Sequence, residues 1–393
     1  MSLVFSCLGH AYMHLFAAFY FIIVLALERA WGLPYHELIE LWTLGALLVG
    51  LGALPAGWLG DRWSASGMMV IFFVGMGASS IVSGFVTGPR TLMAGLAGIG
   101  LFASIYHPVG LAWLVRNSDE RRGKILGING IFGGIGVGAA ALVAGTLIDL
   151  WGWRVAFIVP GVVSVITGLI LLVCLRLGVI VETGAERPRA VPEARKTMLR
   201  GFAVLLLTMF LAAIVYQSTQ AALPKLFSLR LGAWLGDGTV GVGALVGFVY
   251  GIAGVVQVLG GHLADRYRLK TVYVGFLLLQ APFLVLVAGL GGLPLVGVAA
   301  LMVVVSVSAL PAENMLLARY APARHHGLAF GAKFILTFGS APLSLMIVSW
   351  VNRLTGDFYW LFAGLAGVIA LAALAALMLP RARSGGVAMS PAE

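Results

Sequence analysis

The stretch GWLGDRW at 57–63 returns as GHLADRY at 261–267, and this repetition decides how the chain folds. Each residue of the second copy lies 204 positions after its counterpart in the first. The same offset relates two further pairs of positions, Gly123 with Gly327 and Gly152 with Gly356. One spacing that recurs at three separate points indicates a chain built from two duplicated halves.

The segments around these landmarks are strongly apolar. Of the 393 residues, 61% are hydrophobic and 10% are charged, and the mean hydropathy is +1.02, whereas a soluble globular chain carries about 25% charged residues. An apolar helix of about 20 residues crosses a hydrocarbon core of roughly 30 Å. The sequence therefore predicts an all-α integral membrane protein with twelve transmembrane helices in two pseudo-symmetric six-helix bundles. The predicted helices cover 3–27, 38–58, 67–86, 90–115, 124–148, 154–177, 200–222, 238–262, 270–289, 293–318, 327–350 and 357–380.

Polar segments divide the chain into four parts. The stretch 178–199 is charged and contains two prolines, so we interpret it as a cytoplasmic linker. It separates an N-terminal bundle at 1–177 from a C-terminal bundle at 200–380, which a short tail at 381–393 follows. The first apolar segment has no basic region before it and is too long for a signal peptide, so we expect it to remain as a membrane helix.

The net charge of +10 follows the expected membrane topology. With a cytoplasmic N-terminus, most Lys and Arg fall in the loops and helix ends on the cytoplasmic side, which predicts that both termini are cytoplasmic. The basic residues left outside are Arg29, Arg90, Arg154, Lys225, Arg230 and Arg353. This distribution predicts no nucleic-acid partner. Cys7 and Cys174 lie in apolar segments and imply neither a disulfide nor a metal.

The repeated loop carries a glycine, an aspartate and an arginine in each copy. Gly57 and Gly261 permit close helix approach. Asp61 and Asp265 are placed to accept backbone N–H groups at the start of a neighbouring helix, which would fasten one conformation. Arg62 and Arg266 follow them. The alternative is a charged turn that only fixes the topology.

This loop and its repetition resemble the short loop motif of the major facilitator superfamily. The resemblance covers the whole chain and implies a secondary transporter that works by alternating access. It also implies that Asp61 holds the start of the eleventh helix near Gly327, and that Asp265 holds the start of the fifth near Gly123. The first copy departs from the family pattern, because it continues WSASG without the usual basic pair.

Ionisable residues inside membrane helices are costly and are candidates for function. Lys333 in FGAKFILTFGSAP lies about 9 Å along its helix from Gly327, and Glu313 lies about 10 Å from Tyr320. The two opposite charges therefore share one depth and predict an ion pair or an exchangeable partnership. The pair either fastens two helices or serves a cavity.

Further polar residues belong to the same candidate site. His10 and His14 share a helix face, His107 matches Pro311 near Glu313 by the offset, and Pro108 and Pro311 favour bends. A zinc site from His10 and His14 lacks a third ligand in the sequence, so we expect no metal. The remaining candidates for solute binding or coupling are Asn129, which corresponds to Lys333, and Tyr216, Gln217 and Gln220, which either line the cavity or join helices.

Within the superfamily, the histidine-bearing first helix, YHP at 106–108 and AE at 312–313 resemble the fosmidomycin-resistance type of efflux protein. The resemblance implies proton-coupled efflux, by antiport, of an anionic or amphipathic compound. Proton-coupled uptake of an organic carboxylate is the alternative, and a transport-dead membrane sensor a lesser one. We find no nucleophile with its base, no metal set and no nucleotide loop, and so expect no enzyme and no cofactor beyond a proton gradient. A monomer in the bacterial inner membrane, with a small solute and protons as partners, completes the prediction.

Overall fold

The computed structural model describes residues 1–117, 122–180, 195–236, 238–320 and 326–380, and in these residues the regular structure is entirely helical. Twelve helical spans are long and apolar enough to cross a membrane, which confirms the predicted number. Most of the predicted linker at 178–199, and all of the predicted tail at 381–393, lie outside the described residues.

The first six spans contain nine helices and two short irregular helical turns. They are α1 (Ser2–Ala18) with α2 (Tyr20–Trp31); α3 (Tyr35–Ile39), η1 (Glu40–Trp42) and α4 (Thr43–Arg62); α5 (Ala65–Gly84); α6 (Pro89–Ala103), η2 (Tyr106–Gly110) and α7 (Leu111–Arg116); α8 (Arg122–Trp151); and α9 (Trp153–Arg176). The last six spans are α10 (Arg195–Leu235); α11 (Val240–Arg266); α12 (Leu269–Gly289); α13 (Gly292–Ser308) with α14 (Leu310–Tyr320); α15 (His326–Gly339) with α16 (Ala341–Thr355); and α17 (Tyr359–Ala376).

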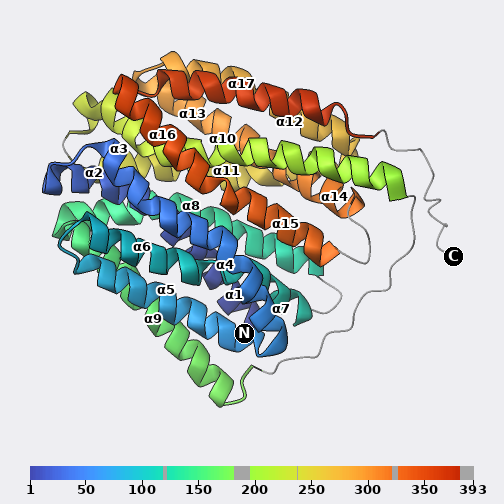
Figure 1. The fold of residues 1–393 in the computed structure, drawn as a ribbon, viewed down its shortest axis with the longest axis horizontal. Helices are drawn as coiled ribbons and strands as arrows, with labels where there is room; N and C mark the ends of the chain where they lie inside the picture. The colour runs from blue at the N-terminus through green and yellow to red at the C-terminus, as the bar shows by residue number, and fades with distance from the viewer. Residues whose placement is uncertain (118–121, 181–194, 237, 321–325, 381–393) are drawn as a thin grey trace.

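The two halves form two bodies that lie against each other, the N-terminal half in blue to green and the C-terminal half in yellow-green to red (Figure 1). Helices α8 and α11 pack across the boundary, as do α4 with α15 and α3 with α16. A Cβ atom on Gly138 would lie 3.1 Å from the backbone nitrogen of Gly251. Gly138 of α8 therefore permits close packing between the halves.

Helix α10 is longer than the sequence indicates. Its apolar stretch ends near residue 222, yet the helix continues through Pro224 to Leu235. Two cationic side chains of the extension have partners in other segments: Lys225 bonds Glu28 of α2, and Arg230 bonds Asp357 in the turn between α16 and α17. Helices α2 and α10 end at the same end of the molecule, at the left of Figure 1. We call it the far end.

Candidate functional site

The fourth and tenth spans are interrupted at positions that match by the 204-residue offset. Helix α6 ends at Ala103 and the chain passes Ile105 into the π-helical turn η2, which holds His107. Helix α13 ends at Ser308, and α14 begins after Ala309 with Glu313 in its first turn. Proline lacks an amide hydrogen and clashes with the preceding turn, so Pro108 and Pro311 explain both breaks. The breaks place His107 and Glu313 in the middle of the molecule.

Lys333 and Glu313 form a buried ion pair between α15 and α14. The Nζ atom of Lys333 lies 2.7 Å from Oε1 of Glu313, and the two residues are 7% and 5% exposed. Lys333 also donates to Oδ1 of Asn314 at 2.5 Å. Two desolvated charges are stable together only where such hydrogen bonds complete their coordination. The ion pair predicted from depth is therefore present.

Tyr273 of α12 supports the acidic partner of this pair. Its hydroxyl lies 3.3 Å from Oε2 of Glu313 and 3.1 Å from the hydroxyl of Thr208 in α10. The carboxylate of Glu313 is thus held by two helices besides its own. Sequence reasoning missed Tyr273, Thr208 and Asn314, because neutral polar residues in an apolar span give no depth signal that singles them out.

The three predicted histidines come together in the N-terminal half. His10 and His14 of α1 have ring centroids 5.0 Å apart, and the ring of His107 lies 5.5 Å from that of His10 and 5.6 Å from that of His14. The Nδ1 atom of His10 lies 2.8 Å from the backbone carbonyl of Asn129 in α8. His107 is buried, and neither of its ring nitrogens has a hydrogen-bond partner among the residues that the structure describes.

Asn129 ties α1, η2 and α8 together beside the histidines. Its side-chain amide donates to the hydroxyl of Tyr106 at 2.9 Å and to the hydroxyl of Ser6 at 3.2 Å. It is 1% exposed. Asn129 therefore positions its neighbours, and its backbone carbonyl fixes His10.

Two phenylalanines join the histidine cluster to the ion pair. The ring of His107 stacks on Phe334 with centroids 4.7 Å apart and lies 4.9 Å from the ring of Phe338. Phe334 directly follows Lys333 in α15. The ring contacts of His107 therefore connect the polar groups of the N-terminal half to α15, the helix that carries Lys333.

The polar residues of α10 are less tightly connected to this site. Gln217 donates to the backbone carbonyl of Thr337 in α15 at 3.3 Å, so it joins helices. Gln220 and Tyr250 line a small cavity between α1, α8, α10 and α11, and the ring of Tyr216 lies 6.3 Å from that of Tyr250. Gln217 thus joins two helices, and the cavity beside Gln220 is lined by neither Lys333 nor Glu313, so a role of these residues in solute binding stays a prediction.

The repeated loops make contacts that the sequence did not predict. Asp61 forms an ion pair with Arg116 at the end of α7, and the guanidinium of Arg62 lies 4.8 Å from the ring of Trp58. The close approach expected at Gly57 is present, because a Cβ there would lie 3.2 Å from Pro108, whereas the one expected at Gly261 is not, because a Cβ there would have no neighbour within 4 Å among the described residues. Asp265 and Arg266 end α11 as exposed residues. The side chains around Gly123 and Gly327, where the resemblance places the partners of these loops, lie outside the described part of the chain. These two contacts therefore stay predictions.

Contacts between the halves close the far end of the molecule. Asp149 at the end of α8 accepts hydrogen bonds at 2.8 Å from the backbone amides of Thr239 and Val240, so it caps the N-terminus of α11 from the other half. Lys225 of α10 lies 2.7 Å from Glu28 of α2. Sequence reasoning counted Lys225 only as a basic residue outside the cytoplasmic loops and did not consider Asp149 or Glu28, because their partners are distant in the chain.

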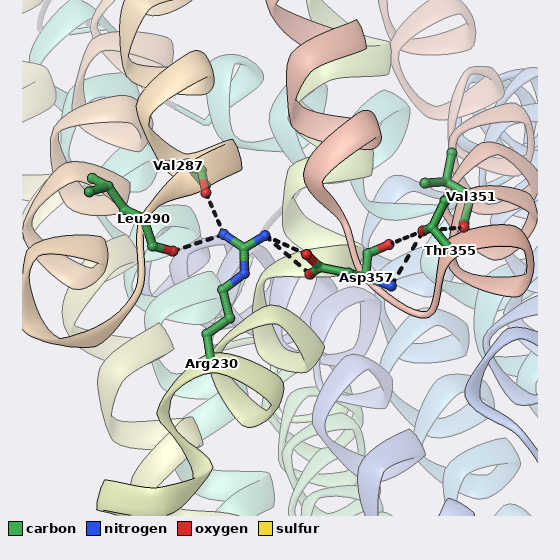
Figure 2. Close-up of polar contacts among 6 residues, drawn as sticks. All are labelled: Arg230, Val287, Leu290, Val351, Thr355 and Asp357. Atoms are coloured by element: carbon green, nitrogen blue, oxygen red, sulfur yellow. Dashed lines mark hydrogen bonds and ion pairs between the residues drawn. The ribbon is translucent and has the colours of Figure 1, made fainter.

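A second network holds the far end of the C-terminal half together. Arg230 bonds both carboxylate oxygens of Asp357 and the backbone carbonyls of Val287 and Leu290, and Thr355 in turn bonds Asp357 (Figure 2). One guanidinium thus joins the ends of α10, α12 and α16, and this geometry is that of a structural anchor.

The fold and the site define a multi-pass membrane transporter of a small solute rather than an enzyme. The family described as Major Facilitator Superfamily matches residues 5–256, which is more than half of the chain. The chain belongs to this superfamily.

Curated relatives agree with this class. The 4-hydroxybenzoate transporter PcaK of Pseudomonas putida is 27% identical, over 80% of this chain and 77% of that protein. The PcaK protein of Pseudomonas aeruginosa is 26% identical, over 91% of this chain and 84% of its own length. A probable 4-methylmuconolactone transporter of Cupriavidus pinatubonensis is 30% identical over 35% of this chain and 34% of that protein.

Among solved structures, a bacterial homologue of the human lysosomal transporter Spinster, in an inward-facing and occupied conformation, has a TM-score of 0.73 to this chain. The two are 14% identical, and the match covers 96% of this chain and 94% of the other. This similarity establishes the fold of the protein.

Proposed function

We propose that this protein carries an aromatic carboxylate into the cell together with a proton, by alternating access. The observation that carries the proposal is the buried pair of Lys333 and Glu313 at 2.7 Å. The helix that holds Lys333, α15, also holds Phe334, whose ring stacks with that of His107. An ammonium group binds a carboxylate and a ring face binds an aromatic ring. The names of the relatives, which include 4-hydroxybenzoate transporters, support this class of solute.

The pair also supplies a means of coupling the solute to a proton. The ionised carboxylate of Glu313 binds the ammonium group of Lys333, so a solute carboxylate has to compete with Glu313 for that ammonium. A proton on Glu313 removes its charge and weakens the pair, which frees Lys333 for the solute. Proton and solute are then bound in the same state of the protein, and that linkage gives cotransport. An inward proton gradient drives such a carrier toward uptake.

Efflux is the competing proposal, and it rests on the resemblance to the fosmidomycin-resistance type at 106–108 and 312–313. An exporter that exchanges solute for protons needs the two to exclude each other from one state. The geometry of Lys333 and Glu313 favours the opposite linkage, and so we place uptake first.

Orientation follows the positive-inside distribution of Lys and Arg, with both termini in the cytoplasm of a bacterium and the protein acting as a monomer in the inner membrane. The far end then faces outward, and the contacts of Asp149 and Lys225 form the outer gate. The two halves rock about the central site, so that one end of the molecule opens as the other closes.

Transport in proteoliposomes tests the proposal. Labelled 4-hydroxybenzoate is offered outside with the external medium acidic, and 4-hydroxybenzyl alcohol serves as the uncharged analogue. We expect uptake of the acid that a protonophore abolishes, no uptake of the alcohol, and no uptake of the acid by Lys333→Ala. Arg353→Gln, which removes an exposed cation at the far end, should transport normally. Uptake that does not depend on the proton gradient, for aromatic and aliphatic carboxylates alike, would contradict the proposal. Solute accumulation only with the gradient reversed would support efflux.

A further inference from the structure

The three histidines at the centre of the N-terminal half have the arrangement of metal ligands. A candidate ligand nitrogen from each of His10, His14 and His107 lies within 4.8 Å of the other two. Nitrogen ligands held at 2.0 to 2.1 Å from a tetrahedral zinc ion are about 3.3 Å apart. Rotamer adjustments of roughly 1 Å would therefore bring the three rings to binding distance.

The orientation of His10 is fixed by an outer partner, as in metal sites generally. Its Nδ1 atom lies 2.8 Å from the backbone carbonyl of Asn129, which can only accept a hydrogen bond. The proton is therefore on Nδ1, and Nε2 carries a free lone pair. A ligating histidine usually donates its second nitrogen to a carbonyl or carboxylate in this way. Gly133 leaves room for the ring, since a Cβ there would lie 2.7 Å from Nε2 of His10.

His107 provides an independent observation that points to a ligand. It is 9% exposed, and both of its ring nitrogens are buried without a hydrogen-bond partner. A buried polar atom that is left unpaired costs about 1 to 3 kcal/mol, so native proteins rarely keep one without a purpose. Its ring stacks on Phe334, and one of its ring nitrogens lies within 4.8 Å of a nitrogen of His10 and of His14.

The surrounding charges permit a cation. The charged side chains that α15 and α14 bring near the histidines are Lys333 and Glu313. They neutralise each other at 2.7 Å. Imidazole is a preferred ligand of zinc, copper and nickel, whereas magnesium and calcium require oxygen ligands. Three neutral imidazoles leave a fourth position open for water or an anion.

We propose that His10, His14 and His107 form a binding site for one divalent transition-metal ion between α1 and η2. His10 and His14 lie on adjacent turns of α1, and η2 brings His107 to them from the fourth span. The sequence contains H-x-x-x-H without a third ligand, and the break before Pro108 brings His107 to that position. The proposal is independent of the identity of the transported solute.

Zinc titration of the full-length protein, purified metal-free with a tag that contains no histidine, tests the site directly. We expect saturable binding of one zinc ion per chain by calorimetry, and a visible absorption spectrum of a nitrogen-ligated centre when Co²⁺ replaces zinc. His14→Ala and His107→Ala should weaken binding by more than the roughly 10- to 100-fold that loss of an outer partner costs. His262→Ala, which removes an exposed histidine of α11, should bind zinc as the wild type does.

His14→Gln keeps the size and polarity of the side chain and guards against misfolding. If this variant elutes as a single species and binds zinc weakly, the site is supported. Wild-type affinity in His14→Gln, or no saturable binding by the wild type, would overturn the proposal. Because the readout is metal binding alone, failure here leaves the transport proposal untouched.

Discussion

At the scale of single residues, the protein places opposite charges where solvent cannot screen them. Lys333 and Glu313 are almost fully buried and 2.7 Å apart. A buried pair is weak evidence for stability, since a well-packed apolar pair is often at least as stable. In the proposed function, this pair binds the carboxylate of an aromatic solute, and that role accounts for a buried pair better than stability does.

A double-mutant cycle separates a fastening role from a binding role. Lys333→Met alone leaves the carboxyl of Glu313 buried without a cation, which costs about 3 to 5 kcal/mol. Adding Glu313→Gln removes the orphaned charge, so we expect thermal stability in detergent to recover in the double variant. Transport should stay absent. Recovery of both stability and transport would show that the pair only fastens α14 to α15.

Phe334 should contribute to the choice of an aromatic solute. Stacked rings are worth about 0.5 to 1.5 kcal/mol beyond their buried area, which corresponds to about a 2- to 10-fold change in affinity. Phe334→Leu should raise the KM for 4-hydroxybenzoate by this factor and leave the KM for an aliphatic carboxylate unchanged. Equal effects on both solutes would contradict ring stacking at this residue.

At the scale of helices, caps and anchors between distant segments hold one conformation. Asp149 accepts the first amides of α11 and is the clearest contact of this kind, because it joins the two halves directly. Arg230 makes a comparable set of bonds within the C-terminal half. We expect the contacts of Asp149 to control opening of the far end, and those of Arg230 to affect only stability.

Asp149→Ala should favour opening of the far end. Loss of an N-terminal cap costs about 0.5 to 2 kcal/mol, which shifts an equilibrium by about 2- to 30-fold. The reporter is Ala18→Cys in a Cys174→Ser background, since Ala18 lines the small cavity shared with Gln220. A membrane-impermeant thiol reagent should label the reporter faster in Asp149→Ala. Glu37→Ala, which removes an exposed acid of α3, is the control, and equal rates in both would exclude a gate at Asp149.

Arg230→Gln should lower stability without changing solute affinity. The variant loses the ion pair with Asp357 at 2.8 Å and the bonds to two carbonyls (Figure 2). Since the Asp357 side chain is 44% exposed, we expect a loss of about 1 to 3 kcal/mol, seen as a lower Tm in detergent. Arg353→Gln should leave Tm unchanged. A changed KM in Arg230→Gln would contradict a purely structural anchor.

At the scale of the whole molecule, the duplication explains what could be predicted from the sequence. The twelve spans follow from hydropathy, and the matched breaks at Ile105 and Ala309 follow from prolines in both copies. The depth of Lys333 and Glu313 predicted their pairing, because rise per residue is fixed in a helix.

Contacts between distant spans could not be predicted in the same way. His107 joins His10 and His14 only after α6 breaks and η2 turns toward α1. The bonds of Asp149 to α11 and of Tyr273 to Glu313 depend on which helices are neighbours, and no sequence period encodes that. The same reason explains why Asp61 was assigned a role at the eleventh helix while its ion pair with Arg116 went unnoticed.

The central claim is that solute and proton bind together through Lys333 and Glu313, and the proton movement that accompanies the solute tests it most directly. In lightly buffered proteoliposomes, 4-hydroxybenzoate added outside without a pH gradient should make the external medium more alkaline as protons enter with it. Glu313→Gln should bind the solute and exchange it across the membrane without moving protons. Solute entry in the wild type with no external alkalinisation, or with acidification, would contradict the claim.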